Sequence, residues 1–335
     1  MPLRLGMLGM WHTHANGIVR QVCAHPDEFQ LVGFYDADPT VVAQRREQWG
    51  PLVPHFELYD SPAAVLDLDL DGVVVEGLVY ENLALARLAL ESGRPVMLEK
   101  PAGANRTEHH ELLACAREQG LHMQMIYLFR YMSAVQELLR LVRAGDLGEI
   151  YHFRARLPKV LVDYPRYLED FAWHPGGIWF EMAGHVIDLM VAVLGAPRSV
   201  HPFLAHHHTE PGHFVDNGLG VFAYDHAFGI IDIPALEVAP NQRRIEVFGT
   251  GGACVIPHLG SGHLSNRNVQ AVEVFRAGAD RWETVELPAA TLQIPDLREF
   301  AAVIRGGKTP DFSLEHDRTV QDALLDACGE ALSPP

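Results

Sequence analysis

The tripeptide Glu99-Lys100-Pro101 ends a short apolar segment, residues 95–98, that has the composition of a buried strand. Open α/β sheets bind their ligands at the carboxyl ends of the strands. A lysine at such an end can orient a substrate oxygen and stabilise the negative charge that forms on it. Pro101 has a fixed φ and no N–H, so it shapes the chain as it leaves the strand. The alternative for Lys100 is an ordinary solvated position, which is the commoner environment of lysine.

A second group, Glu181, His185 and Asp188, follows a Gly-Gly pair. If residues 179–194 form one helix, the three side chains lie at positions i, i+4 and i+7 and share one face. An imidazole titrates near neutral pH and suits proton transfer, and a carboxylate one turn away can help to hold a substrate hydroxyl. The alternative is a surface ion pair or a histidine satisfied within the core.

The turn after the first predicted strand, residues 3–8, contains part of a dinucleotide-binding motif. Such turns use three glycines, of which Gly9 occupies the first position, whereas Trp11 and His14 occupy the second and third. Asp36 ends the second predicted strand, where an acidic side chain accepts hydrogen bonds from ribose hydroxyls and repels a 2′-phosphate. The pattern therefore favours NAD over NADP. The alternative is that the segment Asp36-Ala37-Asp38-Pro39 only caps the helix that follows.

Three further groups of residues contain side chains that suit ligand binding. His12 and His14 could together coordinate zinc, but we expect them to line the cofactor cleft, where an imidazole N–H replaces a missing backbone contact to phosphate. Trp173 and His174 are candidates for a substrate wall, because an aromatic face suits the C–H side of a sugar ring, with core packing as the alternative. The run His206-His207-His208 lies among polar residues and is typical of a loop. We therefore predict no metal site there.

Predicted strands and helices alternate in the first third of the chain, and these elements must position the residues described above. Short apolar strands are predicted at residues 3–8, 30–35, 72–75, 95–98 and 122–127, with helical patterns between them. Strands that are apolar on both faces, each followed by a helix, indicate a parallel sheet covered on both sides. The prediction is an α/β fold whose first domain, residues 1–128, is a doubly wound Rossmann sheet.

The pattern changes in the second predicted domain, residues 129–335. Helices are predicted at residues 132–144, 179–194, 295–304 and 315–332, and a strand at 150–156. Between residues 199 and 257, several strand-like runs are joined by turns with no long helix among them. This arrangement predicts a second, open and mainly antiparallel sheet.

Composition restricts the class of protein. The chain has 335 residues, 48% hydrophobic and 21% charged, as in ordinary folded enzymes. A formal net charge of −17 disfavours nucleic acid and anionic membranes as partners. No apolar run approaches the ~20 residues of a spanning helix, and the N-terminus lacks a signal-peptide layout. Four scattered cysteines without a Cys-x-x-Cys pair fit a reducing cytoplasm.

Three motifs together resemble the Gfo/Idh/MocA family, the glucose–fructose oxidoreductase and inositol dehydrogenase group. They are Glu99-Lys100-Pro101, the turn at residues 145–150, and the Gly-Gly…Glu-x-x-Gly-His-x-x-Asp segment. The resemblance covers almost the whole chain. It implies a Rossmann domain followed by an α/β domain whose open sheet forms homodimers or homotetramers through its face. It also implies NAD(P)-dependent hydride transfer between nicotinamide and the hydroxyl-bearing carbon of a sugar, polyol or related small molecule.

The resemblance also implies roles for single residues. Lys100 would lie beside the nicotinamide and the reacting oxygen, His185 would be the acid/base, and Glu181 would be its carboxylate neighbour. Lys100, Glu181 and His185 would thus be catalytic and, with Trp173, would bind substrate. The residues predicted to bind the cofactor are Gly9, Trp11, His12, Asp36, Gly77, Asn82, Glu99, Lys100, Pro101 and Arg130.

The sequence departs from the family pattern in several places. Gly77 and Asn82 replace the usual Thr and His, Glu181 replaces the usual Asp, and Trp11 stands where a glycine lets the pyrophosphate approach. These departures motivate an alternative, a catalytically inactive dinucleotide- or ligand-sensing protein on the same fold. A third possibility, a metal-dependent lyase or hydrolase built on the His206-His207-His208 run, requires a stoichiometric metal.

Overall fold

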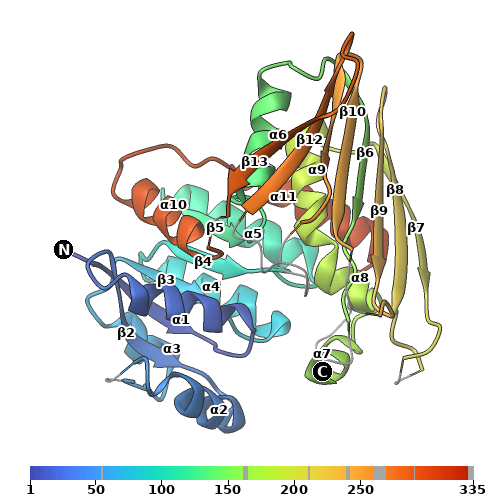
Figure 1. The fold of residues 1–335 in the computed structure, drawn as a ribbon. Helices are drawn as coiled ribbons and strands as arrows, with labels where there is room; N and C mark the ends of the chain where they lie inside the picture. The colour runs from blue at the N-terminus through green and yellow to red at the C-terminus, as the bar shows by residue number, and fades with distance from the viewer. Residues whose placement is uncertain are drawn as a thin grey trace. The chain divides into compact units, whose positions relative to one another are not determined.

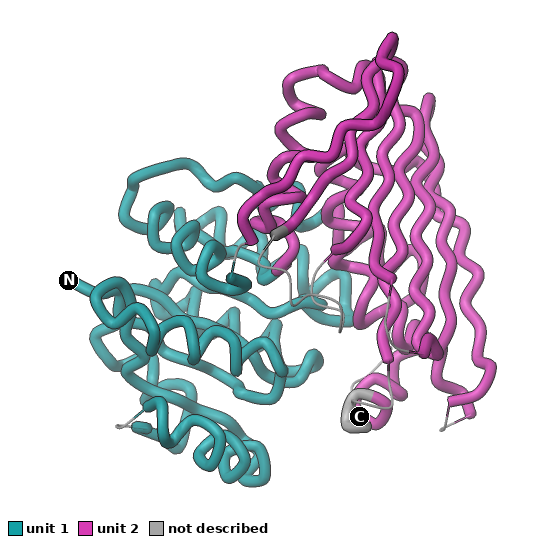
Figure 2. The backbone as a smooth tube through the Cα atoms, viewed as in Figure 1, with its two compact units in different colours: residues 1–126, 291–318 teal, residues 127–290, 319–335 magenta. Residues whose placement is uncertain are grey.

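The computed structural model describes residues 1–53, 56–160, 165–209, 212–238, 242–259, 269–289 and 291–330. The chain forms two compact units, residues 1–126 with 291–318 and residues 127–290 with 319–335 (Figure 2). The first border lies close to the expected one at residue 128. Residues 291–318, however, belong to the first unit, where the Phe300 ring packs against Gly72. Local sequence patterns do not reveal such a return of the chain.

The first unit contains a five-stranded parallel sheet in the order β2-β1-β3-β4-β5 (Figure 1). Its strands are β1 (Leu3–Leu8), β2 (Phe29–Tyr35), β3 (Gly72–Val75), β4 (Val96–Glu99) and β5 (Met123–Ile126). Strand β2 pairs with one edge of β1, and β3, the next strand along the chain, pairs with the other edge of β1. The carboxyl ends of β1 and β3 therefore form the switch point at which such sheets bind ligands. The predicted Rossmann sheet is confirmed.

Among the described residues, six helices lie wholly within this unit: α1 (His14–Ala24), α2 (Pro39–Trp49), α3 (Pro62–Leu66), α4 (Val79–Glu91), α5 (Arg106–Glu118) and α10 (Ile294–Ile304). Side-chain oxygens of Asp38, Ser61 and Asn105 accept backbone N–H bonds at the starts of α2, α3 and α5. Such caps satisfy amides that a helix start leaves without partners. The last helix, α11 (Leu314–Cys328), contains the border between the units.

The second unit contains an eight-stranded sheet in the order β13-β12-β11-β10-β6-β9-β8-β7. Its strands are β6 (Ile150–Arg156), β7 (Ser199–Ala205), β8 (Asn217–Ala223), β9 (Phe228–Pro234), β10 (Arg244–Gly249), β11 (Gly252–Ile256), β12 (Val269–Arg276) and β13 (Glu283–Pro288). Neighbours are antiparallel except β6 and β9, which run parallel. The predicted open, mainly antiparallel sheet is confirmed, and β12 and β13 extend it beyond the expected region.

Helices α6 (Ser133–Arg143), α8 (Gly177–Met182) and α9 (Gly184–Leu194) pack on one face of this sheet (Figure 1). A further helix, α7, spans Pro165–Phe171. The single helix expected over residues 179–194 is two helices that meet at Ala183, whose φ of −65° and ψ of −29° remain helical. Gly184 follows, and a side chain there would meet the Tyr127 ring. Within the described residues, no helix is long and apolar enough to cross a bilayer.

Candidate functional site

Gly9 and Gly77 bring the ends of β1 and β3 into backbone contact. Gly9 has a φ of +76°, and a Cβ built there would lie 2.3 Å from the Gly77 Cα. Glycine is therefore required at position 9, because an L side chain would be strained and would also clash. The two buried glycines form a narrow strip of bare backbone at the switch point, the place where sheets of this kind bind dinucleotides.

Asp36 follows β2 and holds the turn after β1. Its carboxylate accepts hydrogen bonds from the Met10 N–H at 2.6 Å and the Asp38 N–H at 2.9 Å. Burial raises the pKa of Asp36, and these two amides partly offset the rise. The helix cap is Asp38, which accepts from the Thr40 N–H at 2.7 Å. The segment Asp36-Ala37-Asp38-Pro39 therefore does cap α2, as the alternative held, and it does so through Asp38 with Pro39 at the first helical position.

Several backbone N–H groups of the turn between β1 and α1 already donate hydrogen bonds within the first unit. The His12 N–H donates to the Glu76 carbonyl at 3.0 Å, and the His14 N–H donates to His12 Nδ1 at 3.2 Å. Together with the Met10 N–H, these donors already have partners. The Trp11 side chain is only 6% exposed. A phosphate at this turn would thus meet fewer available amides than in a three-glycine turn.

Arg45 on α2 is a residue that sequence reasoning missed. Its guanidinium is buried and donates to the carbonyls of Met10 at 2.7 Å, Trp11 at 2.8 Å and His12 at 3.1 Å. A planar fork with several N–H groups can bridge three carbonyls in this way. The spacing on α2 carries no signal of this role, because the carbonyls belong to another segment of the chain.

Asn82 lies in the first turn of α4 and is fully buried. Neither its amide nitrogen nor its amide oxygen has a hydrogen-bond partner within the described residues. A Cβ at Gly77 would lie 3.2 Å from the Asn82 oxygen, so the amide faces the bare backbone strip. Buried amides without partners are costly, and a bound ligand commonly supplies the missing hydrogen bonds. Gly9, Gly77, Asp36 and Asn82 together fit a bound dinucleotide.

Glu99 is the last residue of β4, and Lys100 follows it and is joined to Pro101 by a cis peptide bond. Lys100 is 1% exposed, so the alternative of a solvated lysine is wrong. Charges act more strongly on nearby oxygens in a surrounding from which water is excluded. The structure therefore places Lys100 at the carboxyl end of β4, as the motif predicted, and it also buries the amine.

His12 and His14 meet two carboxylates in the same unit. His14 Nδ1 lies 3.0 Å from Glu99, and His12 Nδ1 lies 3.3 Å from Glu99 Oε1 and 3.6 Å from Glu76 Oε2. Glu76 and Glu99 are 0% and 1% exposed. Glu76, which follows β3, was not predicted, because the sheet order brings β3 beside both β1 and β4. Ligating atoms of His12, His14 and Glu99 lie close enough to hold one metal ion.

Glu181, on α8 of the second unit, is buried and accepts a hydrogen bond from Lys159 Nζ at 3.0 Å. Sequence reasoning missed Lys159, which lies after β6 and whose backbone N–H bonds the Pro234 carbonyl. His185, on α9, is 4% exposed and packs against the rings of Phe129 and Tyr127. The structure thus gives Glu181 a buried ammonium partner, which no helical spacing predicts.

Arg130 and Asp188 form a buried ion pair. Arg130 Nε lies 3.0 Å from each Asp188 oxygen, and Nη2 lies 2.6 Å from Oδ1. Their side chains are 1% and 0% exposed. Asp188 was predicted to share a helix face with Glu181 and His185, and the structure shows that its carboxylate holds Arg130. Arg130 is therefore held in place by Asp188 within the second unit.

Trp173 and His174 differ in their surroundings. Trp173 is partly exposed and remains a candidate for a substrate wall. His174 is buried, stacks on Phe180 with ring centroids 3.5 Å apart, and accepts the Gly176 N–H at 3.0 Å. Burial lowers the pKa of His174 to about 3, so this imidazole is neutral at ordinary pH. The core-packing alternative is correct for His174.

The run His206-His207-His208 is organised by its backbone. The N–H groups of His207 and His208 donate to the Asp216 carboxylate at 2.8–3.2 Å. Burial raises the pKa of Asp216, but these backbone donors and that of Thr209 outweigh it, so the pKa lies below its usual value. The neighbouring residues 210 and 211 lie outside the described residues. In the described part of the chain, this run supplies no group of three converging metal ligands.

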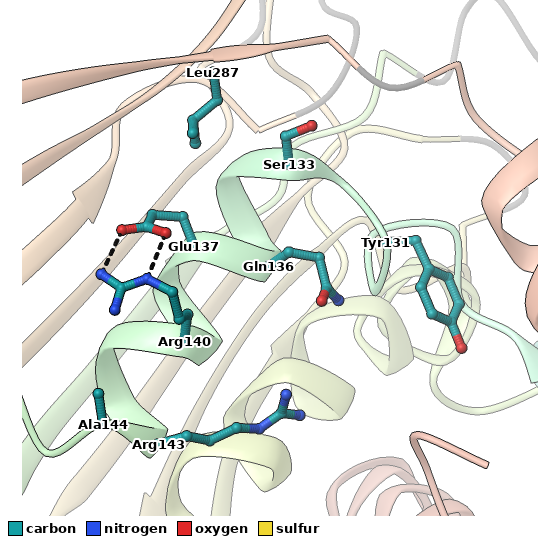
Figure 3. Close-up of a pocket in the computed structure, with 8 residues that line it drawn as sticks. All are labelled: Tyr131, Ser133, Gln136, Glu137, Arg140, Arg143, Ala144 and Leu287. Atoms are coloured by element: carbon teal, nitrogen blue, oxygen red, sulfur yellow. Dashed lines mark hydrogen bonds and ion pairs between the residues drawn. The ribbon is translucent and has the colours of Figure 1, made fainter. Parts of the chain in front are cut away.

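An open pocket of about 720 Å³ lies along α6 in the second unit (Figure 3). It is lined by Tyr131, Ser133, Gln136, Glu137, Arg140, Arg143, Ala144 and Leu287. Glu137 and Arg140 face each other in the close-up and share two hydrogen bonds of 2.8 Å. None of the predicted site residues lines this pocket, and an exposed ion pair on a helix is typical of a solvated face.

Two protein families match the chain. Residues 3–127 match the oxidoreductase family with an NAD-binding Rossmann fold, and residues 135–255 match the GFO/IDH/MocA C-terminal domain. The scyllo-inositol 2-dehydrogenase (NAD(+)) of Bacillus subtilis is 25% identical over 321 residues, which cover 92% of this chain and 86% of that enzyme.

Solved structures share the fold. A 3-ketoreductase from Actinomadura kijaniata in complex with NADP and TDP-benzene has a TM-score of 0.77 at 19% identity, covering 98% of this chain and 97% of that one. A dehydrogenase from Bordetella pertussis in complex with NADH and UDP-GlcNAcA has a TM-score of 0.75 at 19% identity, covering 97% and 95%. Both kinds of nicotinamide dinucleotide thus occur in proteins of this architecture.

Proposed function

Because the chain belongs to the Gfo/Idh/MocA family of NAD(P)-binding oxidoreductases, we propose that it interconverts a secondary alcohol and a ketone on a sugar, a polyol or a related small molecule. The observation that carries this proposal is the bare backbone strip of Gly9 and Gly77 with Asp36 and Asn82 beside it. When bound, the nicotinamide accepts or supplies the hydride.

Asp36 favours NAD over NADP. Its carboxylate ends β2 and can accept hydrogen bonds from ribose hydroxyls, whereas a 2′-phosphate at that place would meet a like charge. The NAD-specific name of the Bacillus subtilis relative supports this choice. The two solved structures divide between NADP and NADH, so the test is a direct comparison of both cofactors. Replacement of Asp36 by Ser should relax the preference for NAD.

The catalytic groups of the proposed reaction are Lys100 and His185. The Lys100 ammonium stabilises the oxygen of the reacting carbon as negative charge develops on it. His185 removes the hydroxyl proton in oxidation and returns it in reduction. Glu181 and its partner Lys159 hold a neighbouring substrate hydroxyl, with Trp173 as a wall against the C–H face. Lys100 and His185 are almost covered, so turnover requires an opening that admits the substrate.

Replacement of His185 by Ala tests this assignment. General acid–base catalysis contributes about 10²- to 10⁴-fold in rate, so kcat should fall within that range. Cofactor affinity should remain unchanged, because the imidazole acts on the substrate. A variant with normal kcat would remove His185 from the mechanism.

A second candidate function is a dinucleotide- or ligand-sensing protein without catalysis. The observation that favours it is the use of the Met10, His12 and His14 amides within the turn, which reduces the donors available to a phosphate. Thermal shifts with NAD, NADH and NADP, followed by a panel of sugars and polyols, separate the two functions. Cofactor binding without turnover on any substrate supports the sensor.

We also propose a homodimer or homotetramer that assembles through the open face of the large sheet. Phe203, Leu219 and Phe228 project from this face and are 64%, 37% and 57% exposed. Phe203 pairs with Leu219 across β7 and β8, so the exposed apolar groups are adjacent. Exposed apolar patches of this kind commonly mark protein–protein contacts.

The four cysteines are free, which supports a reducing, cytoplasmic location.

A further inference from the structure

The carboxyl ends of β1, β3 and β4 bring His12, His14, Glu76 and Glu99 together. We propose that His12, His14 and Glu99, with Glu76 beside them, form a binding site for a divalent transition-metal ion of the zinc type. From the sequence, zinc coordination by His12 and His14 is an alternative to their expected place in the cofactor cleft, and no metal site is predicted. The proposal is independent of the proposed reaction, because its test measures metal content and affinity.

The spacing of the ligating atoms matches a coordination sphere. Zinc binds imidazole nitrogens and carboxylate oxygens at about 2.0–2.2 Å, which separates tetrahedral ligands by about 3.4 Å. Here His14 Nδ1 lies 3.0 Å from Glu99, and His12 Nδ1 lies 3.3 Å from Glu99 and 3.6 Å from Glu76. The rings of His12 and His14 stand edge to face at 82°, so they approach the common point from different directions.

The atoms that converge on this point are mostly hydrogen-bond acceptors. His12 Nδ1 accepts the His14 N–H at 3.2 Å. Within the described residues, both Glu76 oxygens and Glu99 Oε1 are buried and accept no hydrogen bond. Glu99 Oε2 shares a hydrogen bond of 3.0 Å with His14 Nδ1, so the other three carboxylate oxygens are the unsatisfied ones. Buried carboxylate oxygens without hydrogen bonds are costly, and a cation beside them removes this penalty.

A shared proton is the alternative to a metal ion. Burial, followed by the charge of Glu99, raises the pKa of Glu76 well above its usual value, so a protonated Glu76 would relieve part of the repulsion. A proton, however, joins only two groups, whereas a metal ion can bind both imidazoles and the Glu99 carboxylate together. Imidazole ligands favour zinc and its neighbours in the transition series over magnesium and calcium. His14, whose side chain is 18% exposed, provides the route of entry.

Metal loading of the full chain, expressed without a histidine tag, tests the proposal. The protein is stripped with a chelator, loaded with Zn²⁺ and passed through gel filtration, and its zinc is then measured by mass spectrometry. Co²⁺ provides a second probe, because its visible absorption reports ligand type and geometry. We expect one ion per chain and a Co²⁺ spectrum of low-symmetry nitrogen and oxygen coordination.

Two variants localise the ion. His14→Ala and Glu76→Gln should each weaken Zn²⁺ binding by at least about 10- to 100-fold, the loss already caused by removal of an outer-shell partner. His207→Ala is the matched control, because it removes an imidazole from the other histidine-rich segment, and it should bind as wild type does. Circular dichroism identifies variants that do not fold. Wild-type protein without stoichiometric zinc after loading, or binding that is lost in His207→Ala and kept in Glu76→Gln, would overturn the proposal.

Discussion

Asp188→Asn should strongly destabilise the second unit. The substitution keeps the shape of the side chain but removes the charge that faces Arg130, whose guanidinium makes three contacts of 2.6–3.0 Å with the carboxylate. The two side chains are 1% and 0% exposed, so water cannot replace the lost partner. Breaking a buried pair in this way costs about 3–5 kcal/mol.

The Glu137–Arg140 pair is a matched control in the same unit. It also has two hydrogen bonds of 2.8 Å, but its side chains are 19% and 55% exposed (Figure 3). Exposed pairs contribute little to stability, so Arg140→Ala should leave the free energy of unfolding close to that of the wild type. Urea unfolding followed by tryptophan fluorescence measures both variants. Equal losses in Asp188→Asn and Arg140→Ala would refute the argument that burial decides the strength of these pairs.

Three other predictions concern stability and assembly. Burial, aided by the charge of His110, lowers the pKa of His109 to about 3, whereas an unfolded histidine titrates near about 6.5. The unfolded chain therefore binds more protons between these values, and stability falls as pH falls through this window. In urea titrations at several pH values, the stability of His109→Leu should fall less steeply as the pH falls. An unchanged dependence of stability on pH would show that His109 is not its cause. A lysine at position 45 cannot bridge the three carbonyls of the turn after β1. Arg45→Lys should therefore lower the free energy of unfolding by about 2–4 kcal/mol and raise the KM for NAD. Wild-type stability together with a wild-type KM would show that the turn keeps its conformation without Arg45. Phe203→Glu on the open sheet face should shift the mass in light scattering toward the monomer, and an unchanged mass would exclude this face as the contact.

Much of the fold follows from short-range patterns. The Leu3–Leu8 and Gly72–Val75 strands have the predicted bounds, because an apolar run between turn residues is a local property. The Rossmann topology follows from the alternation of strands and helices, and the carboxyl ends of the strands then indicate where Gly9 and Lys100 lie. The burial of Lys100 was not predictable, because it depends on how neighbouring segments cover the end of β4.

Contacts between distant segments explain the rest. Arg45 reaches carbonyls of the turn after β1, Lys159 pairs with Glu181, and Glu76 meets His12 only because β3 lies beside β1. No spacing along one helix or strand encodes such contacts, which arise from topology. The interruption at Ala183 is equally hidden, since the sequence around it continues a helical pattern.

The most direct test of the account is the nicotinamide absorbance during incubation with a panel of sugars and polyols. Wild-type protein should reduce NAD with at least one member of the panel, and Lys100→Ala should lose at least about 10²-fold in kcat, the scale of one electrostatic stabiliser. Bound NAD without any absorbance change across the panel would contradict catalysis, and equal rates for wild type and Lys100→Ala would contradict the role of the buried amine.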